Sequence, residues 1–142
     1  MKYRTGDLFD APKGSYLAHA CNCTGRWGSG IALQFRQKFP KSYKQYHEFC
    51  KSRKVKPGEV LICDEENGYR VVCLFTSRGW GETVDKPRKI VDATKYAIGK
   101  LPTDAPIHMP KINSGLFNVP WEHTAILFFD YDDIDITVWE LP

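Results

Sequence analysis

Residues 25–30 of this chain, Gly-Arg-Trp-Gly-Ser-Gly, have a composition that suits the binding of an anion. Glycine has no Cβ atom, so a phosphate group can approach the backbone of such a turn closely. An apolar strand is expected before the turn, at 15–22, and a helix after it, at 31–39. Loop N–H groups and the positive end of the helix dipole would then point at one place. The glycine offsets match neither the Walker pattern nor the dinucleotide fingerprint. By itself, the stretch predicts an anion site or an unliganded strand-to-helix turn.

A second glycine turn, residues 113–117, lies between an expected strand at 107–112 and an expected helix at 121–129. Ligands of open α/β sheets bind at the carboxyl ends of the strands, so the two turns are expected to face one crevice. Two anion-binding turns in one crevice suit a ligand with two linked phosphates.

The elements that position these turns alternate between strand and helix, with one hairpin. Further strands are expected at 2–6 and 134–141, the hairpin at 59–63 and 69–76, and further helices at 42–50 and 86–101. Ser42 is expected to cap the helix that it begins. The order predicts a three-layer α/β/α fold with a mixed central sheet. The length of 142 residues predicts a single domain spanning 1–142.

Composition and charge exclude several classes of function. The net charge of +3 comes without a basic block, so nucleic acid is not expected as the main partner. No apolar run approaches the roughly 20 residues of a membrane span, and no signal peptide follows Met1. The five cysteines are odd in number and scattered, which indicates reduced thiols and a cytoplasmic location. Cys21 and Cys23 lack a second pair at ligand spacing, so neither a metal nor a cofactor is expected.

Four strings of residues resemble the macrodomain family, the ADP-ribose-binding modules, and the resemblance extends over nearly the whole chain. The strings are Gly6-Asp7-Leu8, His19-Ala20-Cys21-Asn22, Trp27-Gly28-Ser29-Gly30-Ile31-Ala32 and Met109-Pro110-Lys111-Ile112-Asn113-Ser114-Gly115-Leu116-Phe117. The resemblance implies that Asp7, with Leu8 beside it, meets the adenine and that Asn22 meets the distal ribose. The alternative for Asp7 is that it caps the turn that follows it. It also implies two phosphate loops and an aromatic side chain against the adenine. The first loop comprises Trp27, Gly28, Ser29, Gly30 and Ile31, and the second comprises Asn113, Ser114, Gly115, Leu116 and Phe117. The aromatic side chain is that of Trp139.

Within the family, the chain most resembles the branch of the yeast ADP-ribose 1''-phosphate phosphatase, through strings that begin at His19, Cys73 and Met109. This resemblance implies a metal-independent phosphatase that converts ADP-ribose 1''-phosphate to ADP-ribose and phosphate. One alternative is a non-catalytic reader of ADP-ribose. Another is an ADP-ribosyl hydrolase acting on protein or nucleic acid. The hydrolase branch uses a lysine after the fourth strand and, in its protein-acting members, an aspartate in the second loop. Ser77 and Phe117 stand at those places, which disfavours the hydrolase.

His19 and Asn22 are the candidates for catalysis. The imidazole of His19 would act as an acid or base because histidine titrates near neutral pH, the alternative being a buried structural histidine. Asn22 would orient a ribose hydroxyl or the attacking water, the alternative being an asparagine that only forms the turn. Residues three apart on a strand point to opposite faces, so the two share a site only if the strand ends or bulges between them. Arg26 either neutralises a terminal phosphate or is a solvated loop arginine. Trp80 and Phe117 either line the distal ribose pocket or serve only in packing.

Overall fold

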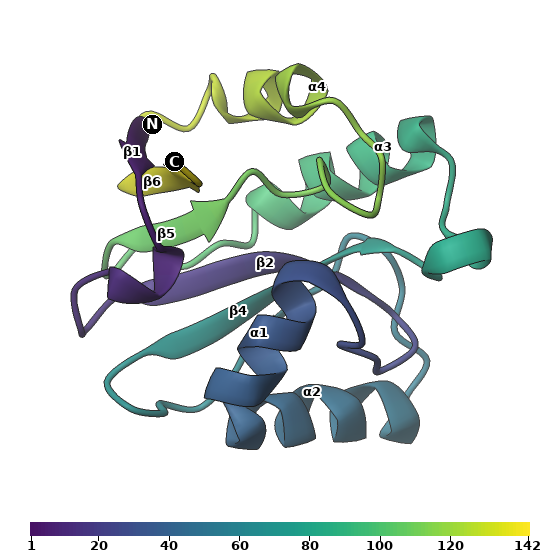
Figure 1. The fold of residues 1–142 in the computed structure, drawn as a ribbon. Helices are drawn as coiled ribbons and strands as arrows, with labels where there is room; N and C mark the ends of the chain where they lie inside the picture. Colours follow the sequence, from purple (N-terminus) through teal and green to yellow (C-terminus); the bar gives the residue numbers. More distant parts are fainter.

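A computed structural model describes residues Met1–Pro142, which fold around one six-stranded sheet (Figure 1). The strands lie in the order β1-β6-β5-β2-β4-β3, and every neighbouring pair is parallel except β3 and β4. The predicted mixed sheet is therefore confirmed. The strands are β1 (Lys2–Thr5), β2 (Tyr16–Asn22), β3 (Val60–Ile62), β4 (Arg70–Ser77), β5 (Ile107–Pro110) and β6 (Ile136–Glu140).

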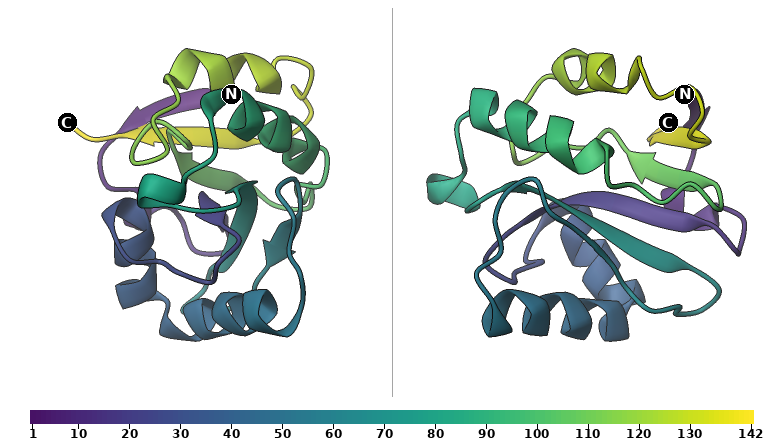
Figure 2. Two further views of the ribbon diagram at one scale, coloured as in Figure 1. Left: turned by 90° about the vertical axis from the view of Figure 1, so that its right-hand side faces the viewer. Right: turned by 180° about the vertical axis from the view of Figure 1, so that it is seen from behind.

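Helices cover both faces of the sheet, which confirms the three layers (Figures 1 and 2). On one face lie α1 (Gly30–Lys38) and α2 (Pro40–Ser52), and on the other lie α3 (Pro87–Ile98) and α4 (Trp121–Ala125). Three short 3-10 turns complete the fold: η1 (Leu8–Asp10), η2 (Gly81–Thr83) and η3 (Ile126–Phe128). None of the helices combines the length and the apolar composition that crossing a membrane requires.

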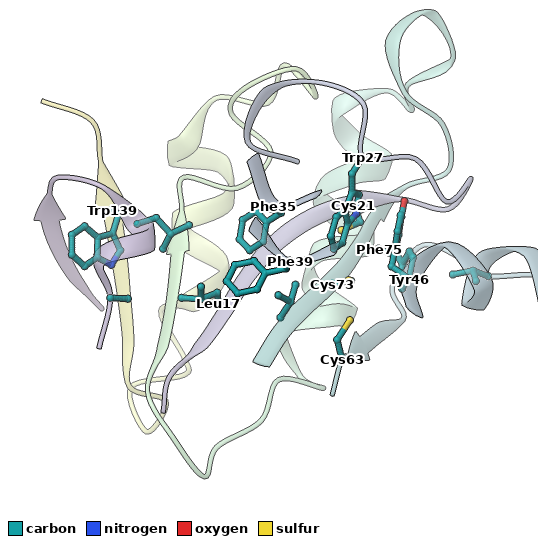
Figure 3. Close-up of a cluster of buried hydrophobic side chains, with 14 residues drawn as sticks. Leu17, Cys21, Trp27, Phe35, Phe39, Tyr46, Cys63, Cys73, Phe75 and Trp139 are labelled. Atoms are coloured by element: carbon teal, nitrogen blue, oxygen red, sulfur yellow. The ribbon is translucent and has the colours of Figure 1, made fainter. Parts of the chain in front are cut away.

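The central strands β2 and β4 are buried on both sides, which explains their nearly continuous apolar sequences. Successive side chains alternate between the faces. Leu17 and Cys73 belong to the core beneath α1 and α2, whereas Ala18 and Val72 belong to the core beneath α3. The sheet therefore separates two hydrophobic cores. Figure 3 shows the aromatic side chains and thiols of the first one.

Several predicted helix boundaries are wrong, and the helix expected at 86–101 spans only Pro87–Ile98. The helix expected at 42–50 begins at Pro40, and Ser42 is not its N-cap. Proline suits the first helical position because it has no N–H group to satisfy there. The cap comes instead from the hairpin, where the Glu66 carboxylate accepts hydrogen bonds from the backbone N–H groups of Lys41 and Ser42 and from the Ser42 hydroxyl. The helix expected at 121–129 is α-helical only to Ala125 and continues as η3.

Candidate functional site

A cavity of about 880 Å³ lies at the carboxyl ends of the parallel strands. Strands β6, β5, β2 and β4 are consecutive neighbours in the sheet, so the segments that follow them lie side by side along this edge. The two glycine turns follow β5 and β2 and occupy the middle of the edge. Most of the predicted ligand-binding residues line the cavity: Asn22, Trp27, Gly28, Ser29, Gly30, Ile31, Asn113, Ser114, Gly115, Leu116, Phe117 and Trp139.

The first glycine turn presents unpaired backbone donors at the start of α1. The N–H groups of Gly28, Ser29 and Gly30 donate no hydrogen bond within the protein. Ser29 is the N-cap residue of α1, yet its side chain makes no capping bond, and no acidic residue stands in the first turn. The positive end of this helix is thus left for an external anion.

The second glycine turn lies directly against the first. A Cβ atom added to Gly30, whose φ is +61°, would come within 3.3 Å of Leu116 Cδ1. The N–H groups of Gly115, Leu116 and Phe117 also donate no hydrogen bond within the protein. Two sets of free donors therefore face one cavity, an arrangement suited to two linked phosphate groups.

Asn113 shapes the second turn from beneath. Its φ of 68° turns the chain, and its side-chain amide is buried. Its Oδ1 accepts a hydrogen bond from the Thr76 hydroxyl at 2.8 Å, while its Nδ2 donates to Thr94 Oγ1 at 2.9 Å and to Thr124 Oγ1 at 3.3 Å. With the side chain held by three hydroxyls, Asn113 ties the turn to β4, α3 and α4.

The side-chain amide of Asn22 likewise holds the first turn through hydrogen bonds. The ladder between β2 and β4 is irregular between Cys21 and Asn22, which brings Asn22 to the cavity. Its Oδ1 accepts hydrogen bonds from the N–H and hydroxyl of Thr24 and from Tyr46 Oη, and its Nδ2 donates to the Arg26 carbonyl at 2.8 Å. The amide thus closes the turn over residues 22–26.

Trp139 lies at the end of the cavity nearest β1 and β6. Its Nε1 donates a hydrogen bond to His108 Nδ1 at 2.9 Å, which fixes the indole plane. Burial lowers the pKa of His108, so its ring stays neutral and able to accept this bond. Thr5, Glu140 and Leu141 also line this end, and no sequence motif pointed to them.

The structure does not bring His19 to the cavity. The side chain is fully buried, with its ring stacked on Phe35 at a centroid distance of 4.0 Å and 5° between planes. The Trp27 ring lies beside it at a centroid distance of 4.7 Å, in an edge-to-face arrangement. The irregularity in β2 falls after His19, so this residue keeps the ordinary alternation of the strand and points into the core beneath α1, where Figure 3 shows Phe35 and Trp27.

Asp7 and Leu8 are likewise absent from the lining of the cavity. The Asp7 carboxylate accepts a hydrogen bond from the Phe9 N–H at 3.0 Å and so caps η1. Leu8 is buried in the core beneath α1 and α2. The short turn after β1 uses both residues internally in this structure.

A cluster of soft ligand atoms lies in the same core. His19, Cys21 and Cys73 place one ligand atom each within 4.8 Å of one another, a set that could hold a metal ion. Spacing along the chain did not reveal it, because Cys73 comes from the neighbouring strand. Burial raises the pKa of the Cys21 thiol, but the Cys73 thiol, His19 and the Trp27 indole N–H together lower it to about 6. Trp27 Nε1 has no oxygen or nitrogen partner.

Comparisons with known proteins agree on one family. Residues 18–128 match the model of the Macro domain family. A protein of Lodderomyces elongisporus named ADP-ribose 1''-phosphate phosphatase is 38% identical and aligns over 98% of this chain and 97% of its own. A protein of the same name from Candida albicans is 37% identical over 98% of both chains. The macrodomain of Mycobacterium tuberculosis DarG superimposes with a TM-score of 0.81 at 25% identity, covering 97% of this chain and 95% of that one.

Proposed function

The chain belongs to the Macro domain family, and we propose that it is an ADP-ribose 1''-phosphate phosphatase, the activity for which its fungal relatives are named. The observation that carries the proposal is the pair of adjoining glycine turns whose backbone N–H groups are free and face one cavity. The reaction consumes one water molecule and yields ADP-ribose and inorganic phosphate.

We place the diphosphate of the ligand between the two turns. Hydrogen bonds to a charged group contribute about 1.5–3 kcal/mol each, so a few of them support micromolar binding. Trp139 then offers its ring to the adenine at one end. The distal ribose and its 1''-phosphate extend past Asn22 and Phe117 toward the segment that follows β4.

Positioning and charge stabilisation carry the chemistry in this proposal. The titratable side chains among the lining residues are Cys21, Arg26, Lys111 and Glu140, and Lys111 is paired with Glu140. The free N–H groups at the start of α1 are held in place before the phosphate of the ligand arrives. They can therefore stabilise the negative charge of the transition state and lower the activation barrier without a cost of reorganisation. The one carboxylate of the lining, Glu140, is already paired with Lys111 at the Trp139 end of the cavity, which supports a metal-independent reaction.

His19 enters the proposal as a positioning residue. Its ring stacks on Phe35 and packs against Trp27, which follows Arg26 in the chain and lines the cavity. Asn22 remains a candidate for contact with the distal ribose, since it lines the cavity while its amide closes the turn. The five free cysteines support a location in a reducing compartment such as the cytoplasm.

A non-catalytic ADP-ribose reader is the second candidate, favoured by the absence of a histidine from the lining of the cavity. An ADP-ribosyl hydrolase is disfavoured because Ser77 occupies the place of its lysine. The Ser77 hydroxyl donates to the Gly79 carbonyl and accepts from the Asp85 N–H, so it braces the loop after β4.

The test is phosphate release from ADP-ribose 1''-phosphate by the purified protein in the presence of EDTA, with calorimetric binding of ADP-ribose in parallel. We expect multiple turnovers and micromolar ADP-ribose binding. Binding without release would replace the phosphatase with the reader. Release that EDTA abolishes would overturn the metal-independent reaction.

A further inference from the structure

One cation in the cavity lacks a carboxylate partner. Arg26 and Lys111 are the two cationic residues of the lining. The ammonium group of Lys111 pairs with the carboxylate of Glu140, whose neighbour Trp139 marks one end of the cavity. No carboxylate lies within salt-bridge distance of Arg26. The positive charge of Arg26 is therefore available to an anionic ligand.

Arg26 lies at the opposite end of the cavity from Trp139. It follows β2, and the side chain reaches Trp80, which follows β4. Along the sheet, β6 and β4 are three strand spacings apart, or roughly 14 Å, with the two glycine turns between them. A ligand that places its adenine at Trp139 and its diphosphate at the turns has its remaining end at Arg26.

Two contacts position the exposed Arg26 side chain, and two hydrogen bonds to its backbone fix the point from which it extends. The guanidinium carbon lies 4.7 Å from the centroid of the Trp80 ring. Nearer the backbone, Arg26 Nε is 3.3 Å from where a Cβ atom on Gly28 would stand, so the side chain runs across the first glycine turn. The Arg26 N–H donates to Tyr46 Oη at 3.1 Å, and the Arg26 carbonyl accepts from Asn22 Nδ2.

This arrangement differs from that of a freely solvated loop arginine. Stacking on an indole face uses the flat surface of the guanidinium and leaves its in-plane N–H donors free. Those donors match two oxygens of a phosphate group at once. Fixing the side chain before the ligand binds also lowers the entropic cost of recognition.

We propose that Arg26, held on the face of Trp80, binds the terminal 1''-phosphate and makes this site prefer ADP-ribose 1''-phosphate to ADP-ribose. The inference rests on the proposed function, because it takes the orientation of the ligand from it. Arg26 acts here through charge and geometry, and Trp80 is a positioning residue for it.

The experiment compares wild-type protein with Arg26→Gln, Arg26→Lys and Trp80→Leu. For each we would measure kcat and KM with ADP-ribose 1''-phosphate and the Kd of ADP-ribose. We expect Arg26→Gln to lower kcat/KM ten- to a hundredfold and to change the ADP-ribose Kd less than threefold. Arg26→Lys keeps the charge but loses the fork geometry, so it should recover part of kcat/KM. Trp80→Leu should lie between wild type and Arg26→Gln.

Arg36→Gln is the matched control. Arg36 is an exposed arginine stacked on Tyr43 at 4.4 Å, outside the lining of the cavity, so this variant loses the same charge and a similar stack. Its kcat/KM should equal that of wild type. An equal loss of affinity for both ligands in Arg26→Gln would overturn the proposal, because Arg26 would then only shape the turn. The proposal would also be overturned if Arg36→Gln lost as much kcat/KM as Arg26→Gln.

The proposed function and this inference fail in distinguishable ways. If the wild type releases no phosphate, the phosphatase is refuted, and the Kd of intact ADP-ribose 1''-phosphate takes the place of kcat/KM. A tighter Kd for the phosphorylated ligand that Arg26→Gln abolishes would support the inference in a reader. Equal Kd values of the wild type for both ligands would refute it.

Discussion

Replacing His19 with leucine separates a histidine that supports the site from one that performs its chemistry. The ring is fully buried, stacked on Phe35 and edge-to-face with Trp27, and its only polar side-chain neighbour within hydrogen-bonding distance is the Cys21 sulfur, 3.5 Å from Nε2. Leucine has a similar volume, fits an apolar core and cannot titrate. We expect His19→Leu to change the free energy of unfolding by less than about 1.5 kcal/mol, the range of volume-conserving core substitutions.

The companion variant His19→Ala measures the packing role itself. Deleting a buried ring leaves a cavity, and large-to-alanine substitutions in cores cost about 2–5 kcal/mol. For a chain of this length each kcal/mol lowers the melting temperature by about 3–4 °C, so we expect a drop of roughly 10 °C. ADP-ribose affinity should fall in His19→Ala, because Trp27 loses support beside the first glycine turn.

The assay is phosphate release from ADP-ribose 1''-phosphate at 15 °C, where both variants remain folded, with melting curves and ADP-ribose calorimetry on the same samples. We expect His19→Leu to keep kcat within about threefold. General acid–base catalysis contributes about 10²–10⁴-fold. A His19→Leu variant that melts and binds like wild type while kcat falls a hundredfold, about 2.7 kcal/mol of transition-state stabilisation, would refute the structural role and restore His19 to the chemistry.

Three further predictions follow from the contacts of the site. Tyr46→Phe removes the hydroxyl that bonds to Asn22 and to the Arg26 N–H. The free energy of unfolding, from denaturant melts, should fall by about 1–3 kcal/mol, and ADP-ribose affinity, from calorimetry, should fall several-fold. No change in either quantity would contradict the role of Tyr46 in the first turn. Burial lowers the pKa of His108 below its unfolded value, so the stability contribution of its neutral ring is present above about pH 6.5 and is lost as the pH falls through the folded pKa. The melting temperature of the wild type should therefore drop more steeply between pH 7 and 5 than that of His108→Gln. Parallel melting curves of the two proteins would contradict this role. Gly30→Ala places a Cβ atom at φ +61° and 3.3 Å from Leu116, so ADP-ribose should bind about fivefold or more weakly by calorimetry, whereas Gly99→Ala, at the end of α3 with φ −64°, should bind like wild type.

The order of the elements and the composition of the turns were enough to predict the layers, the mixed sheet and the two glycine turns that adjoin one cavity. Short stretches of sequence encode these features through glycine spacing and the order of strand, turn and helix. The two turns adjoin in the structure because they follow neighbouring parallel strands, β5 and β2. The start of α2 was mispredicted for the opposite reason. Its cap is the carboxylate of Glu66, which reaches the helix from a hairpin more than 20 residues away in the chain.

The faces of β2 could not be assigned from the sequence. A strand buried on both sides is apolar throughout, so alternation says that His19 and Cys21 share a face but leaves open whether that face meets a ligand or a helix. Pairing with β4 decides the question, because it sets His19 opposite Cys73 beneath α1. No residue pattern within 15–22 predicts that β4 is the strand that pairs with it.

The irregularity between Cys21 and Asn22 links the core to the site. Up to Cys21 the strand delivers side chains into the aromatic and thiol core, and the shift in register then carries Asn22 to the cavity, where its amide closes the first turn. Trp27 returns from that turn into the same core and stacks on Tyr46 at 4.8 Å, while the Tyr46 hydroxyl bonds the Asn22 carbonyl. The segment that leads into the free N–H groups is thus anchored by buried aromatic rings at Asn22 and at Trp27. Loosening this core should therefore weaken ligand binding before it unfolds the protein, since the turn has few other contacts to hold its donors in line.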